Sequence, residues 1–242
     1  MSTTKDLAAL GRLVAVHHGW TAAKAFKAYQ MDDAARAKVS AVALDILKGC
    51  APVAQDSALI SAAFAVGLET GLDAPIQVVA GTLSINGAPV FEDRSPLRAD
   101  AFSGSERSWK GHVWVMIGPY IADIAMFRAA YSRAGPAVLS RHVDLTFGPN
   151  KGLYVDLWAK TQKVGLKYEP SHVLSREDVN TLMARAYHTI STGFAGLLAA
   201  RAAQVSGRPA FITERGIYLL ERQIEVMMAE WIGDQVDTGL AM

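Results

Sequence analysis

The sequence predicts an α+β fold, with N-terminal helices, a central antiparallel sheet and C-terminal helices. Alanine-rich segments with helical spacing occupy about the first 70 residues. Segments rich in β-branched and aromatic residues follow between about 76 and 170, and helical patterns return after Ser175. We see no internal repeat and no linker, so we expect one domain over 1–242, whose C-terminal helical part spans about 175–242.

The composition is that of a globular protein. The chain has 242 residues, of which 51% are hydrophobic and 19% charged, enough to bury a large core. A net charge of +1 without charged blocks gives no support for binding to nucleic acid or to a membrane surface. No apolar run approaches the ~20 residues of a membrane span, and no signal peptide is recognisable. A single cysteine fits a reducing compartment, so we expect a cytoplasmic protein.

The N-terminal part predicts two helices before the cysteine. A helical pattern covers residues 4–30, and Gly19 is expected to break it. Asp32 can cap a second helix, which Gly49 ends in the expected position after the last turn.

Cys50, the only cysteine, lies in a tight joint between two predicted helices. Pro52 belongs in the first turn of the second of them, at 53–70, which places Cys50 at or just before its N-terminus. The partial positive charge of a helix N-terminus favours the thiolate, and its free N–H groups can bind an oxyanion. Cys50 is therefore a candidate nucleophile, and Gln55, one turn into the helix, is a candidate substrate-binding residue.

The other elements follow from the same kinds of signal. IQVVAGTLSI, at 76–85, is typical of a strand, and Ser175 with Asp178 resembles a capping box at the start of a helix. We also expect a loop at 86–110, strands at 138–147, 153–160 and 164–170, and helices at 176–204 and 212–231.

The segment GHVWVMIGPYIADIAMF, at 111–127, predicts a hairpin with Gly118 and Pro119 as its two-residue loop. The residues that share one face in this register are His112, Trp114, Ile121, Asp123 and Ala125. His112 and Asp123 are diagonal neighbours, so the carboxylate can hold one ring nitrogen and leave the other free. Such a pair is the base and the orienter of a nucleophilic triad, although His and Asp at strand ends are also common without a catalytic role.

Cys50, His112 and Asp123 follow one another in an order that resembles the transglutaminase-like, papain-like cysteine superfamily. In that family a Cys at the N-terminus of a long helix faces a His on one strand and an Asp on the next. The matching segments, within about residues 45–127, are Gly71-Leu-Asp-Ala-Pro-Ile-Gln-Val-Val-Ala-Gly81 and His112-Val-Trp-Val, with Asp123 after the turn. The resemblance implies a papain/transglutaminase-like core, with Cys50 as nucleophile, His112 as general base and Asp123 as orienter.

The position of the nucleophile stays open, because the sequence departs from the family pattern. Counting back from Gly71 and Gly81, the family nucleophile falls nearer Ala54. Either the helix is longer here, or the family cysteine is lost and Cys50 is incidental. Leu44 stands where papain-like proteases have an oxyanion glutamine, and the Arg-Gly-Gly-x-Cys signature of arylamine N-acetyltransferases is missing.

The resemblance implies cysteine-dependent acyl transfer, or amide or peptide hydrolysis, through an acyl-enzyme. We expect a peptide, a protein or a small amide or thioester as substrate, with no cofactor and no metal. Trp109 and Trp114 join Gln55 as candidate substrate-binding residues. His142 and Asp144 would share a strand face, but a third metal ligand is not apparent. The alternative is a non-catalytic binding module that keeps the fold with an inert or displaced thiol.

Overall fold

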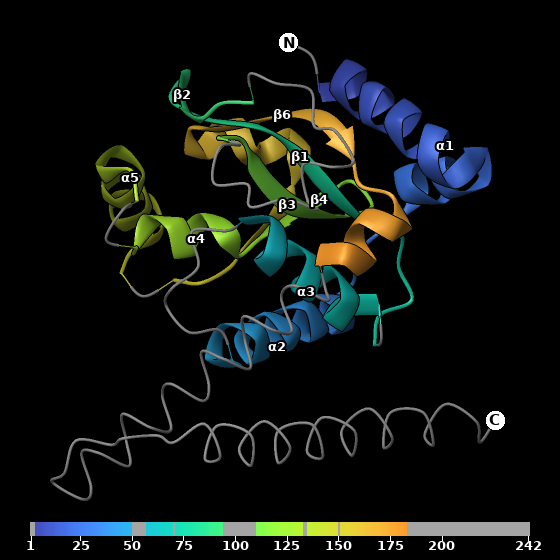
Figure 1. Cartoon of the computed structure of the whole chain (residues 1–242), viewed down its shortest axis with the longest axis horizontal. Coiled ribbons are helices and arrows are strands. Elements are labelled where there is room, and N and C mark those ends of the chain that lie inside the picture. The colour runs from blue at the N-terminus through green and yellow to red at the C-terminus, as the bar shows by residue number, and fades with distance from the viewer. Residues whose placement is uncertain are drawn as a thin grey trace, which may run out of the picture. The chain divides into compact units, whose positions relative to one another are not determined.

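The computed structural model describes residues 3–49, 57–69, 71–93, 110–132, 135–149 and 151–182 (Figure 1). The chain divides into two units, Met1–Ala186 and Tyr187–Met242, and every described residue belongs to the first. The described residues combine helices with an antiparallel sheet, so the α+β class predicted from the sequence is confirmed. A single domain over 1–242 and a helix at 212–231 stay predictions.

The elements of the described chain are bounded as follows. The helices are α1 (Thr3–Ala28), α2 (Asp33–Gly49), α3 (Ser57–Glu69), α4 (Ala125–Ala130), α5 (Ala137–Phe147) and the 3₁₀ helix η2 (Trp158–Val164). The strands are β1 (Ile76–Ile85), β2 (Ala88–Phe91), β3 (His112–Ile117), β4 (Tyr120–Asp123), β5 (Tyr154–Leu157) and β6 (Leu166–Val173). A further helix begins at residue 176 and is described as far as 182.

The local signals for helix ends and breaks are confirmed where the structure describes them. Gly19 leaves the helical conformation inside α1, with φ 82° and ψ 166°. The Asp32 side chain accepts the backbone N–H of Ala35 at 2.7 Å, which caps α2. Ser175 and Asp178 exchange hydrogen bonds as in a capping box, because each side chain accepts the backbone N–H of the other, at 3.1 and 3.0 Å.

The sheet is antiparallel throughout, in the order β2-β1-β3-β4-β5, with β6 on the other edge of β1. The long strand β1 pairs with β3 through Ile76–Gly81 and with β6 through Val79–Ile85. Its last residues, Leu83–Ile85, also pair with β2. β1 is therefore the strand that connects the rest of the sheet.

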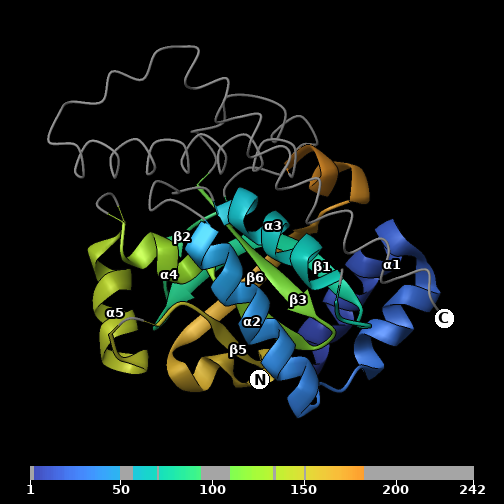
Figure 2. The same ribbon diagram turned by 90° about the horizontal axis from the view of Figure 1, so that it is seen from below.

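Two apolar clusters lie on the two faces of the sheet. One contains Val78, Val113 and Val115 and is covered by α2 and α3 (Figure 2). The other contains Trp114 and Met116 and is covered by α1, α4 and α5. Because side chains alternate along a strand, consecutive residues of β3 belong to opposite clusters.

The strand predicted at 138–147 is wrong, because this segment forms α5. Alternation of Val143, Leu145 and Phe147 suggested a half-buried strand, but Leu145 is 77% exposed. Leu139 and Val143, four residues apart, are the buried pair, and this is the spacing of one helix face. The expected strand at 153–160 is correct only for β5, after which the chain enters η2.

Two further corrections concern the neighbourhood of the hairpin. The segment 86–110, predicted as a loop, contains the short strand β2. Ala125 was predicted on the same strand face as His112 and Asp123, but β4 ends at Asp123 and Ala125 begins α4. The chain thus turns into a helix immediately after the aspartate.

Candidate active site

The hairpin of β3 and β4 has the register that the sequence predicts. Ile117 pairs with Tyr120, Met116 with Ile121, and Val115 with Ala122. Gly118 has φ 55°, as the first position of a II′ turn requires, and Pro119 fills the second position with its fixed φ. A two-residue loop therefore sets which side chains of the two strands meet.

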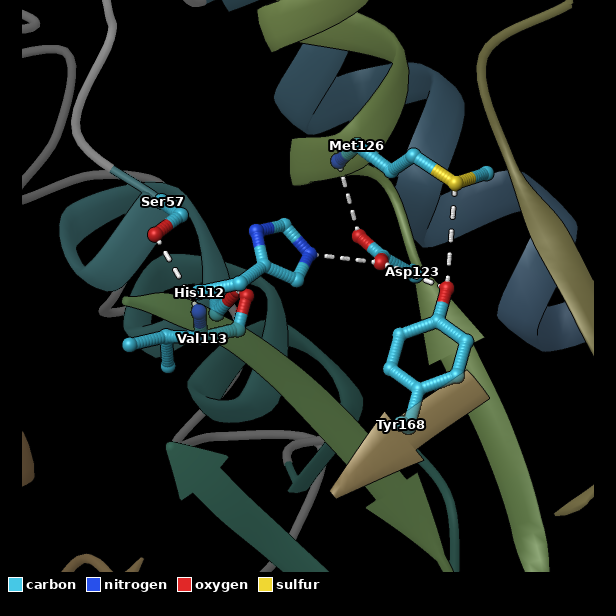
Figure 3. A network of polar contacts seen from close by, with 7 residues as sticks. Ser57, His112, Val113, Asp123, Met126 and Tyr168 are labelled. Carbon is cyan, nitrogen blue, oxygen red and sulfur yellow. Dashed lines mark hydrogen bonds and ion pairs between the residues drawn. The ribbon is translucent and has the colours of Figure 1, made fainter. Parts of the chain in front are cut away.

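His112 and Asp123 are in direct contact, as predicted. The imidazole Nε2 and the carboxylate Oδ2 lie 2.7 Å apart (Figure 3). Their side chains are only 1% and 0% exposed. The contact is thus a buried hydrogen bond between a histidine and a carboxylate.

Asp123 has two more hydrogen-bond donors, and together they define the state of the imidazole. The Tyr168 hydroxyl donates to Oδ2 at 2.9 Å, and the backbone N–H of Met126 donates to Oδ1 at 2.9 Å (Figure 3). An ionised carboxylate accepts hydrogen bonds and donates none. With Asp123 in this form, Nε2 of His112 is the donor to Oδ2, and in the neutral ring the lone pair lies on Nδ1.

Tyr168 was not among the residues predicted for the site. It lies on β6, which pairs with β1, so no local pattern connects it with the hairpin. Burial raises the pKa of the Tyr168 hydroxyl well above 10, and the charge of Asp123 and the hydrogen bond to it raise it further. The phenol therefore stays a hydrogen-bond donor at neutral pH.

Nδ1 of His112 is buried and has no hydrogen-bond partner within the described residues. The ring stacks on Phe91 of β2, with centroids 5.2 Å apart and planes 16° apart. Figure 3 shows Nδ1 on the side of the ring opposite Asp123, toward Ser57. One ring nitrogen therefore contacts the carboxylate, and the other has no partner among the described residues.

Ser57 and Ser61 join α3 to the strand that carries His112. Ser57 Oγ accepts the backbone N–H of Val113 at 3.1 Å, and Ser61 Oγ donates to the carbonyl of Val113 at 2.8 Å. Neither serine was predicted as a site residue from the sequence. The available signal was two serines four residues apart, hence on one face, in an otherwise apolar helix.

Of the remaining predicted site residues, the structure describes only Trp114. Cys50, Gln55 and Trp109, like Ala54, lie outside the described residues. Trp114 lies beside the site, with its ring 6.2 Å from His112 and 5.1 Å from Tyr168, but it is only 1% exposed. A role of Trp114 in substrate binding stays a prediction.

The pair His142 and Asp144, considered as metal ligands from the sequence, does not lie on a strand. His142 and Asp144 lie on α5 rather than on a strand, and His142 Nε2 contacts the carbonyl of Val164 at 3.0 Å. Across the described part of the chain, no three His, Cys, Asp or Glu residues are grouped as metal ligands. Within the same residues, no helix has the length and apolar character needed to cross a membrane.

The comparisons with known proteins match only the C-terminal part. Residues 173–240 are similar to a family model described as a domain of unknown function, DUF3492, which covers less than half of the chain. No curated protein and no solved structure matches the chain. The site therefore has to be interpreted from its own chemistry.

Proposed function

We propose that the protein transfers acyl groups or hydrolyses amides through an acyl-enzyme, with His112 as the general base and Asp123 as its orienter. The observation that carries this proposal is the buried His112–Asp123 pair, whose Nδ1 lacks a partner in the described chain. An ionised carboxylate on Nε2 favours the tautomer in which Nδ1 accepts a proton, and it stabilises the imidazolium that results. Tyr168 and Met126 hold the carboxylate in place for this task.

In the proposed reaction, Nδ1 takes the proton of a nucleophile as the nucleophile attacks a carbonyl carbon. The imidazolium then gives this proton to the leaving group, and an acyl-enzyme remains. Water or an amine releases the acyl group in a second step with the same base. The substrate class is a peptide, a protein, or a small amide or thioester.

Cys50 is the nucleophile that the sequence offers for this reaction. The resemblance to the transglutaminase-like, papain-like superfamily supports it, because there a Cys at a helix start faces the His and the Asp. An assignment to that superfamily, including its core, is part of the proposal. In the sequence, Cys50 precedes Ser57, the described start of α3, by seven residues.

A second candidate function is a non-catalytic binding module, and one observation favours it. The His112 and Asp123 side chains are 1% and 0% exposed, as is usual for a polar pair that stabilises a core. In this case the dyad fixes the hairpin against β6, and no acyl group is transferred.

An acyl-trapping experiment separates the two functions. The full chain is incubated with p-nitrophenyl esters and amides of increasing acyl length, while p-nitrophenol or p-nitroaniline release and intact mass are followed. We expect a burst with one bound acyl group per chain, and His112→Ala should slow it by about 10²–10⁴-fold. His17→Ala, at an exposed histidine of α1, is the matched control. Equal release by the wild-type and His112→Ala chains across the whole set would favour the binding module.

A further inference from the structure

We propose that the hydroxyl of Ser57 is the acyl-accepting nucleophile of this site, which makes it a serine-type site for esters and amides. The inference rests on the proposed acyl transfer and differs from it in the atom that attacks. Ser57 begins the described part of α3, a helix of 13 residues. It is half-buried, whereas the base behind it is fully buried, so the attacking atom lies closer to solvent than the imidazole.

The position of Ser57 relative to the base follows from the backbone of β3. Its Oγ accepts the N–H of Val113, the residue directly after His112, at 3.1 Å. Figure 3 shows Ser57 on the Nδ1 side of the imidazole, with Asp123 on the opposite side. The three side chains thus follow the order hydroxyl, imidazole, carboxylate, which is the order of a nucleophilic triad.

Two described groups of the site bear on this step: a ring nitrogen without a donor and a hydroxyl whose hydrogen is not used. Nδ1 carries the lone pair and has no donor within the described residues. Ser57 uses its oxygen as an acceptor and keeps its own hydrogen. These two described groups do not form a hydrogen bond in the structure, and the proposal requires them to approach each other when substrate binds while Oγ keeps the Val113 N–H. Catalytic hydrogen bonds are often long before substrate binds.

The Val113 N–H also has a chemical role in this arrangement. As Ser57 loses its proton, negative charge develops on Oγ, and a fixed N–H donor on that oxygen stabilises it. The donor belongs to a buried strand and needs no reorganisation when the charge appears. An alkoxide-like oxygen is therefore less costly at Ser57 than at a free serine.

The reaction balances without any group beyond water. The Ser57 Oγ–H bond breaks, the proton moves to Nδ1, and Oγ forms a bond to the carbonyl carbon. The bond from this carbon to the leaving oxygen or nitrogen then breaks, and the leaving group takes the proton from Nδ1. Water attacks the resulting ester, gives a proton to Nδ1, and Oγ recovers that proton as the acid leaves.

Ser61 provides a matched control on the same helix. It lies one turn after Ser57 and also bonds to Val113, but it donates to the carbonyl at 2.8 Å. It is 1% exposed, and its hydrogen is already used in this bond. Ser61→Ala therefore removes a serine from the same surface of α3 without removing the proposed nucleophile.

The test uses a fluorophosphonate, which reacts with activated serines, on the full folded chain, with intact-mass analysis and peptide mapping. We expect one adduct, located on Ser57, which Ser57→Ala abolishes and Ser61→Ala retains. His112→Ala should slow the labelling at least about 100-fold. Ser57→Cys adds a readout that does not need a serine probe: the new thiol should react with iodoacetamide at pH 6, where an ordinary thiol is under ~1% ionised.

The outcomes distinguish this inference from the proposed function. An adduct on any other residue, or no adduct on a chain that still releases p-nitrophenol in a His112-dependent way, overturns Ser57 as the nucleophile. Labelling of Cys50 by iodoacetamide that depends on His112, with Ser57 unmodified, has the same effect but keeps acyl transfer. If neither residue reacts and no ester is cleaved, both proposals fall. Circular dichroism spectra of all variants show whether a lost signal is a lost fold.

Discussion

Tyr168 and Asp123, 45 residues apart in the chain, are joined by a buried hydrogen bond of 2.9 Å to the same carboxylate oxygen that contacts His112. One oxygen therefore accepts from a phenol and from an imidazole, while the other accepts from a backbone N–H. An asparagine, which has an N–H donor in place of one carboxylate oxygen, cannot accept all of these hydrogen bonds. The carboxylate is thus the group on which the geometry of the whole site depends.

Asp123→Asn is expected to reverse the tautomer of His112. The asparagine amide can donate to Nε2, and the ring proton then moves to Nδ1. The free energy of unfolding should fall by about 1–3 kcal/mol, because the buried Tyr168 hydroxyl, which donates to the same oxygen, loses its acceptor. Long-range ¹H–¹⁵N spectra of the histidine rings check the tautomer, and urea unfolding checks the stability. Asp144→Asn, at an exposed position of α5, is the control. An unchanged His112 spectrum in the Asn variant would contradict the assignment.

Stability is expected to fall above about pH 10. Burial, the largest cause for both residues, raises the pKa of the Tyr154 and Tyr168 hydroxyls above 10. The unfolded chain loses these protons near pH 10 while the folded chain keeps them, so the folded state binds more protons. The stabilisation from these two protonated hydroxyls is fully present below pH 10. Above pH 10, each tyrosine lowers the free energy of unfolding by up to about 1.4 kcal/mol per pH unit. Urea unfolding between pH 8 and 11 measures this slope, which Tyr154→Phe should reduce.

Acidification is expected to weaken the contact between α1 and β6. Burial lowers the pKa of His18 and His172, and the nearby His17 lowers both further. The rings of His17 and His172 meet edge to face at 5.2 Å. The unfolded chain takes up protons near pH 6.5 before the folded chain does, so this stability is present above 6.5 and is lost as the pH falls. The urea midpoint should be lower at pH 5 than at pH 7, and His172→Gln should reduce the difference. A urea midpoint that is equal at pH 5 and pH 7 would contradict a loss of stability through these histidines.

Replacing Gly118, in the turn between β3 and β4, by alanine should destabilise the fold more than the same change at Gly87, in the turn between β1 and β2. Gly118 has φ 55°, and an added Cβ would lie 2.7 Å from Tyr29 Cβ and 2.9 Å from the Phe26 carbonyl. Gly87 has φ 86°, but an added Cβ meets nothing within 4 Å. Gly87→Ala should therefore cost only the about 1–2 kcal/mol of the left-handed conformation, and Gly118→Ala clearly more. Equal losses in urea unfolding would mean that the contact with α1 relaxes easily.

Trp114 is expected to contribute to stability far more than Trp20. Trp114 is 1% exposed in the cluster beside the site, whereas Trp20 on α1 is 66% exposed. Trp114→Ala should lower the free energy of unfolding by about 3–5 kcal/mol, and Trp20→Ala by under about 0.5 kcal/mol. Thermal and urea unfolding measure both. A small loss for Trp114→Ala would leave room for its predicted role in substrate binding.

The parts of the fold that were predictable from the sequence are those fixed by residues close together in the chain. Strand β1 was predicted with its observed ends, and the Gly118-Pro119 loop set the contact between His112 and Asp123. Segment 138–147 was mispredicted, because apolar residues at 139, 143, 145 and 147 fit both a strand and a helix. The helix α5 is favoured because Leu139 and Val143 pack together into the cluster that contains Trp114 and Met116.

The parts of the site that were not predictable depend on pairing between distant segments. Tyr168 reaches Asp123 because β6 lies beside β1, and a single sequence carries no signal for this pairing. Ser57 was overlooked because a lone cysteine nearby is the stronger chemical signal. Its contact with Val113, 56 residues away, exists only once α3 lies on β3.

The attachment of β6 to β1 also has a consequence for how the chain folds. The hairpin of β3 and β4 closes a two-residue loop, and hairpins form within about 1–10 μs. In contrast, β6 joins residues as far apart as Ser171 and Ala80, separated by 91 positions, and such contacts form slowly. We therefore expect His112 and Asp123 to meet early and Tyr168 to arrive late. Until β6 pairs with β1, the Asp123 carboxylate would be exposed to water. The docking of β6 would then bury the carboxylate and complete its hydrogen bonds.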